Sequence, residues 1–182
     1  MADTPVLVTP TRLRDFIVDA LAAMKMPRPA EITADLMVRT DLRGVDSHGI
    51  GVLPRYHELW QAGYISMDAE PTVVRDDMAT GLFDGQKGLG HHVSTLAMRR
   101  CIEKARTCGV GMVAVRNSGH YGAAANYSMM ATRSSFSPHR DRHCALKHGF
   151  RGSPAPPALA RHSRPMPAPT VSFERSRGPG RR

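Results

Sequence analysis

The sequence predicts an α/β fold: a three-helix N-terminal region, then an incomplete α/β domain, then a disordered basic C-terminal tail. Apolar residues recur with helical periodicity through residues 1–70, and short strand-like runs alternate with helical segments through residues 71–132. Strands that alternate with helices are typical of an α/β layer. All periodicity ends near Arg133, so we treat residues 133–182 as a separate segment.

The N-terminal region is predicted to contain three helices. After Pro10, apolar residues follow the i, i+3, i+4, i+7 spacing of one helix face. This face carries Leu13, Phe16, Ile17, Ala20, Leu21 and Met24. Pro27 ends the helix, and a second one extends to about Gly44. Its buried face carries Ile32, Leu36 and Met37. A third helix begins near Pro54, because proline suits the first helical turn, and it ends at Gly63.

Two short strands open the next region, at residues 72–75 and 80–84. Residues 90–107 predict the strongest helix of the chain. Its apolar face carries Val93, Leu96, Ala97, Cys101 and Ala105. Residues 110–115 are nearly all apolar, which predicts a buried strand. A further helix is predicted to open at Gly122 and to reach at least Met130.

The excess positive charge lies in the tail. The chain has a net charge of +9, and residues 133–182 hold eleven Lys and Arg against two acidic residues. This segment also contains eight of the 14 prolines, and we expect it to be disordered because it lacks the apolar area that would offset ordering. One alternative function is that the arginines neutralise nucleic-acid phosphates. Because aromatic residues are not interleaved with them, we do not favour nucleic acid as a partner.

The sequence argues for a cytoplasmic protein without a metal. It shows neither a secretory signal nor an apolar stretch long enough to span a membrane. The three cysteines are an odd number without framework spacing, so we expect reduced thiols. Four residues of the tail have i, i+4 spacings that would suit zinc on a helix: His139, His143, Cys144 and His148. Their order fits no common zinc finger, so we predict no metal site.

The first segment that suggests chemistry is DLRGVDSHGIGVLPRY, residues 41–56, where Ser47 and His48 are surrounded by glycines. A histidine in a glycine-rich bend can be presented to a cleft as a general acid or base. Taken alone, a Ser-His pair more often makes a hydrogen bond at a helix end. The sequence therefore leaves both interpretations open.

The second segment is RNSGHYGAAA, residues 116–125, which lies between a predicted strand and a predicted helix. In α/β folds such loops hold ligands, because backbone N–H groups and the helix dipole face an anion. A tight strand-to-helix turn that needs glycine explains the same residues equally well. The nearby GQKGLG, residues 85–90, fits neither common phosphate-loop pattern and is explained by a turn.

These motifs occur together in an order that resembles a known family. DLRGVDSHGIG…LPRY, then LFDGQKGLG, then IEKAR…GVGMVAVRNSGHYGAA are similar to the malate/L-lactate dehydrogenase family of NAD(P)-dependent oxidoreductases, across residues 10–132. That family is unrelated in fold to the Rossmann-type lactate and malate dehydrogenases. The resemblance implies hydride exchange between NAD or NADP and a small 2-hydroxy or 2-oxo acid. Full-length relatives form dimers.

The resemblance also implies roles for individual residues. His48 would exchange a proton with the C2 oxygen of the substrate beside the cofactor, and Ser47 would orient its ring. The cofactor would be bound by His48 and by a loop that comprises His120, Tyr121, Gly122, Ala123 and Ala124. Many relatives hold the substrate carboxylate with an arginine four residues after the histidine. Val52 stands at that position here, which leaves Arg55 as a possible substitute.

Full-length relatives are much longer, and their second half supplies an aspartate that completes the Ser-His relay. Residues after Arg133 do not resemble that half. An Arg-, Pro- and Ser-rich stretch is what a GC-rich gene read in the wrong frame would encode. We therefore hypothesise a truncated or frameshifted chain with negligible turnover.

Overall fold

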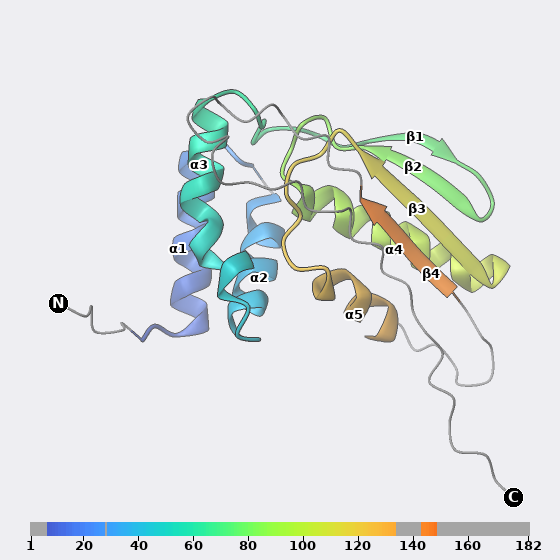
Figure 1. The fold of residues 1–182 in the computed structure, drawn as a ribbon, viewed down its shortest axis with the longest axis horizontal. Helices are drawn as coiled ribbons and strands as arrows, with labels where there is room; N and C mark the ends of the chain where they lie inside the picture. Colours follow the sequence, from blue (N-terminus) through green and yellow to red (C-terminus); the bar gives the residue numbers. More distant parts are fainter. Residues whose placement is uncertain (1–6, 28, 134–142, 149–182) are drawn as a thin grey trace, which may run out of the picture.

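A computed structural model describes residues 7–27, 29–133 and 143–148. It places a group of helices beside an α/β layer (Figure 1). The elements follow in this order: α1 (Pro10–Ala23), α2 (Pro29–Asp41), the short 3₁₀ helices η1 (Asp46–His48) and η2 (Ile50–Val52), α3 (Leu53–Gln61), β1 (Thr72–Asp76), β2 (Thr80–Asp84), α4 (Gly90–Cys108), β3 (Val110–Arg116), α5 (Ala125–Arg133) and β4 (His143–His148).

The three predicted N-terminal helices are present as α1, α2 and α3, and they share one apolar core. Ile17, Leu21 and Met37 are fully buried in it. Phe16 was expected on the buried face, but it is 59% exposed. The contacts of α1 are mainly with α2, so its buried stripe is narrower than the sequence suggested.

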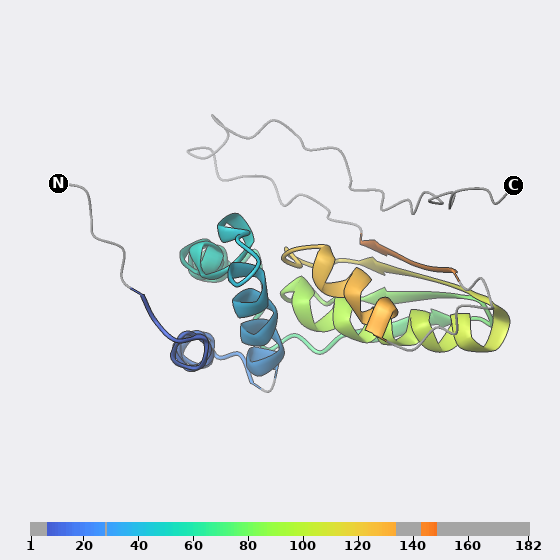
Figure 2. The ribbon, with the colours of Figure 1, turned by 90° about the horizontal axis from the view of Figure 1, so that it is seen from below.

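The sheet has the order β1-β2-β3-β4. β1 is antiparallel to β2, whereas β2, β3 and β4 are mutually parallel. α4 and α5 lie on one side of it (Figure 2). Burial alternates along β3: Val113 and Val115 are buried, while Val110 and Met112 are about half exposed. The predicted buried strand is therefore present but buried on one face only, the face that carries Val113 and Val115.

Two predictions near the end of the described chain need correction. α5 begins at Ala125 rather than at Gly122, because Gly122 has a φ of +74° and cannot belong to a right-handed helix. Residues 143–148 were expected to be disordered, but they form β4, which pairs with Val110–Val115 of β3. The helical spacing considered for zinc does not apply to a strand, and His139 lies outside the described residues. The rest of the predicted tail, residues 134–142 and 149–182, also lies outside the described residues.

The cysteines differ from each other. Cys108 is free, as expected, whereas Cys101 is disulfide-bonded, so the expectation of three reduced thiols is wrong. Cys101 is fully buried between α4 and the sheet, and the spacing of the cysteines carried no signal of this disulfide. Within the described ranges, no helix combines the length and apolarity needed to cross a bilayer.

Candidate functional site

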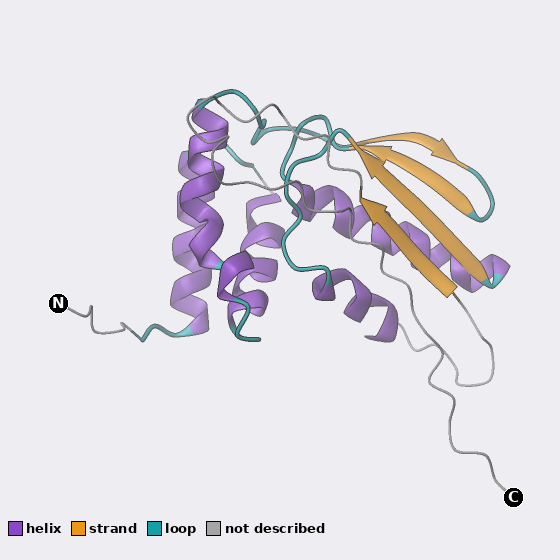
Figure 3. Ribbon diagram, viewed as in Figure 1, coloured by secondary structure: helices purple, strands orange, loops and turns teal. Residues whose placement is uncertain are grey.

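Both glycine-rich motifs lie where the helical region meets the α/β layer. The loop from β3 to α5 runs along this boundary, and the turns between α2 and α3 approach it (Figure 3). This arrangement places His48 of the first motif beside His120 of the second, with 5.2 Å between the ring centroids. Segments more than seventy residues apart in sequence therefore form one site.

A short bend holds Ser47 and His48. Both lie in η1, and Ser47 Oγ is 2.8 Å from His48 Nδ1. The bend is fixed by Asp41, which accepts a hydrogen bond from the Ile50 N–H at 2.8 Å. Burial raises the pKa of Asp41, although the Ile50 bond opposes this. A Cβ on Gly49 would lie 1.5 Å from Asp41 Oδ1, so only glycine permits this contact.

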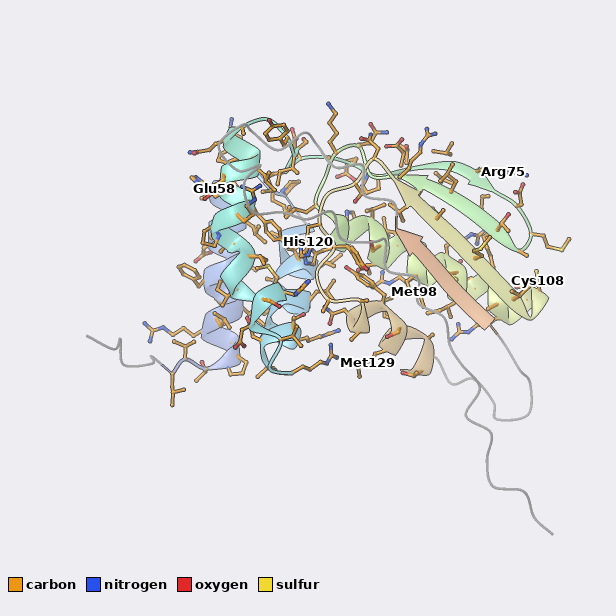
Figure 4. All side chains as sticks on the ribbon, viewed as in Figure 1. Glu58, Arg75, Met98, Cys108, His120 and Met129 are labelled. Atoms are coloured by element: carbon orange, nitrogen blue, oxygen red, sulfur yellow. The ribbon has the colours of Figure 1, made fainter. Side chains whose placement is uncertain are left out.

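Tyr56 joins the site from α3 and was not predicted. Its side chain is 1% exposed, and its hydroxyl is 2.7 Å from His120 Nδ1. Figure 4 shows His120 between α3 and the sheet region. Burial, together with the nearby His48, lowers the pKa of His120 to about 4. The ring is therefore neutral near pH 7, and because burial raises the pKa of Tyr56, its phenol keeps its proton.

Asp84, at the end of β2, fixes the loop that carries His120. Its carboxylate accepts three hydrogen bonds of 2.9–3.0 Å, from Gln86 N, Arg116 Nε and Asn117 Nδ2. Burial opposes ionisation of Asp84, but these donors outweigh it and lower the pKa. Asn117 has a φ of +49°, which redirects the chain after β3. The backbone carbonyl of His120 then accepts the Gly90 N–H at 2.9 Å.

The remaining residues of the predicted cofactor loop lead into α5. Tyr121, Ala123 and Ala124 are half-buried, and Gly122 is buried. A Cβ on Gly122 would lie 2.7 Å from His91 Nε2, so the loop backbone packs directly on this buried histidine. The two alanines immediately precede the first turn of α5.

The two arginines near the site have different surroundings. Arg55, the suggested carboxylate ligand, forms an ion pair with Glu58 at 2.9 Å along α3. Helical geometry places Glu58 almost opposite Tyr56, and Figure 4 shows it on the outer side of α3. Arg43, which was not predicted, donates to Asn126 Oδ1 at 2.7 Å and so brings a guanidinium to the first turn of α5. No motif spacing signalled this long-range contact.

The comparison with protein families decides which family this chain belongs to. A family model described as malate/L-lactate dehydrogenase matches residues 8–136. The chain belongs to the malate/L-lactate dehydrogenase family. The predicted resemblance is therefore confirmed, and the family is one of hydroxyacid dehydrogenases. Among the residues that the structure describes, no group of three or more His, Cys, Asp or Glu side chains could hold a metal ion.

Individual relatives of this dehydrogenase-family chain agree. A malate dehydrogenase of Pyrococcus abyssi is 36% identical over 167 residues, 91% of this chain and 41% of that protein. An L-sulfolactate dehydrogenase of Methanocaldococcus jannaschii is 40% identical over 126 residues, 69% of this chain and 37% of that protein. The solved malate dehydrogenase of Pyrococcus horikoshii matches with a TM-score of 0.67 and 40% identity, covering 70% of this chain and 37% of its own.

The extent of these matches varies. The chain spans about two fifths of the length of these relatives. The family model ends close to residue 132, where we expected the resemblance to end. The match to the P. abyssi enzyme covers 91% of the chain and must therefore extend further.

Proposed function

We propose that this region carries the acid–base residues and part of the cofactor site of an NAD(P)-dependent dehydrogenase acting on a small 2-hydroxy or 2-oxo acid. The observation that carries this proposal is the convergence of Ser47, His48 and His120 at the boundary between the helical region and the α/β layer. Reduction of a carbonyl needs a proton donor for the developing alkoxide, and a second imidazole beside that donor can hydrogen-bond the substrate.

In the reductive direction His48 acts in its protonated form: its Nδ1–H donates to Ser47 Oγ, and its second ring proton is on Nε2. His48 gives the Nε2 proton to the C2 oxygen of the substrate and becomes a neutral imidazole. In the oxidative direction, the same nitrogen takes the proton from the substrate hydroxyl. Because the Asp41 carboxylate holds the bend, the imidazole keeps its orientation through the cycle.

The loop that precedes α5 suits a dinucleotide. Ala123 and Ala124 are small enough to let a phosphate approach the backbone, and the positive end of the α5 dipole favours an anion there, although the N–H groups of Asn126, Tyr127 and Ser128 already donate to the carbonyls of these two alanines. Arg43 adds a positive charge beside this turn. His120, Tyr121 and Gly122 complete the loop. NAD or NADP, when bound, supplies or accepts the hydride.

The test is NADH oxidation with pyruvate, oxaloacetate or 2-oxoglutarate, combined with NADH binding followed by fluorescence. We expect weak NADH binding and negligible turnover, since hydride transfer needs both reactants held about 3–3.5 Å apart. A clear rate that depends on His48 would refute the prediction of inactivity. Absence of any response to NADH or to the 2-oxo acids would refute the proposed site.

We further propose that residues after Arg133 are encoded out of frame. The eleven basic residues and eight prolines after position 132 support this, as does the end of the family match at residue 136, whereas the longer match to the P. abyssi enzyme counts against it. Translating the other frames of the coding DNA downstream of codon 132 tests it. If neither encodes the rest of a dehydrogenase, the proposal fails. Homodimer formation and a cytoplasmic location stay predictions, and sedimentation of the purified chain tests the first.

A further inference from the structure

The hydrogen bond between Tyr56 and His120 has no part in the proton transfer described above. The Tyr56 ring belongs to the apolar core of the helical region and also packs edge-on against His91, with 5.9 Å between ring centroids. Its hydroxyl lies 2.7 Å from His120 Nδ1, and its ring lies beside that of His120, with 5.9 Å between centroids. A phenol held on all sides by packing presents its oxygen at a fixed position.

The direction of this hydrogen bond follows from burial. If Tyr56 donates, its proton is satisfied and His120 Nδ1 acts as the acceptor, so the ring proton lies on Nε2. If His120 Nδ1–H donates instead, the phenolic proton is left inside the protein. Within the described residues, Tyr56 has no second hydrogen-bond partner. An unsatisfied buried donor costs about 1–3 kcal/mol, so donation by Tyr56 is favoured.

We propose that Tyr56 is a positioning residue that holds His120 in its Nε2–H tautomer, so that the ring presents a neutral N–H donor beside His48. The identity of the ligand that accepts this hydrogen bond rests on the proposed function, whereas the tautomer of His120 does not depend on it. Ser47 Oγ occupies His48 Nδ1 in the same way, so each ring has its Nε2–H left for a ligand, and the two ring centroids are 5.2 Å apart. The keto oxygen and the carboxylate of a 2-oxo acid are both acceptors and match such a pair.

The experiment uses the full chain labelled with ¹⁵N-histidine and records long-range ¹H–¹⁵N correlations near pH 7. His120→Gln identifies the His120 signals. In the unsubstituted chain we expect the pattern of an unprotonated Nδ1 and a protonated Nε2. Tyr56→Phe removes only the hydroxyl, and we expect both tautomers to become populated, which brings the two nitrogen shifts together. Tyr64→Phe, on the chain after α3, is the matched control and should leave the pattern unchanged.

Two results overturn the proposal. One is a protonated Nδ1 in the unsubstituted chain, which does not depend on any variant folding. The other is a folded Tyr56→Phe chain that keeps a single Nε2–H tautomer. A purely structural role for Tyr56 would lower stability without shifting the tautomer ratio. Titration with pyruvate and NADH separates the two proposals: an Nε2–H tautomer without any ligand response supports the role of Tyr56 and removes the proposed function.

Discussion

Substituting Gly122 tests whether the loop before α5 is fitted to His91. Alanine at a φ of +74° costs about 1–2 kcal/mol by itself. The added Cβ would also lie 2.7 Å from Nε2 of His91, which is fully buried and cannot swing away. Forcing an extra carbon into a packed site costs about 1–3 kcal/mol more. We therefore expect Gly122→Ala to lower the free energy of unfolding by about 2–5 kcal/mol.

Gly109→Ala is the matched control, because Gly109 has a φ of +79° and nothing within 4 Å of its ideal Cβ. Urea unfolding with linear extrapolation measures both variants. The difference between them isolates the contact with His91. In the double variant His91→Ala/Gly122→Ala, the second substitution should cost no more than Gly109→Ala. Equal losses in Gly122→Ala and Gly109→Ala, within about 0.5 kcal/mol, would refute the reasoning.

Three further outcomes are expected. Gly49→Ala displaces the Asp41 carboxylate and breaks its bond from the Ile50 N–H, which should cost about 1.5–3 kcal/mol in urea unfolding; a loss below 0.5 kcal/mol would show that the bend adapts. Because the folded-state pKa of His120 is about 4, the unfolded chain binds its proton first as the pH falls below 6.5, so stability should drop between pH 6.5 and about 4. His120→Asn should flatten this slope, and an unchanged slope would contradict the low pKa. Gln86→Gly relieves a φ of +51° and should raise the melting temperature, whereas a fall would show that the side chain matters more than the backbone.

Local patterns predicted most of the fold because each element's own residues determine it. The periodicity of residues 90–107 gave α4 within one residue of its observed end. The start of α5 was wrong because Gly122 and its two alanines are compatible with a helix, and only the packing of Gly122 on His91 fixes the positive φ. β4 was missed for a similar reason. Its strand state depends on pairing with β3, which no property of residues 143–148 alone indicates.

The candidate site was only partly predictable, and the difference lies in what each residue contacts. Ser47 and His48 could be found because they are adjacent and lie among glycines. Tyr56 could not, because at the start of α3 it has the appearance of an ordinary core residue, and its partner His120 is 64 residues away. A buried tyrosine nevertheless needs an acceptor for its hydroxyl. The described polar motifs converge at one boundary, so the acceptor that Tyr56 needs is the neighbouring imidazole of His120. Because Tyr56 belongs to the core of the helical region, the packing of that core determines which nitrogen of His120 carries the proton.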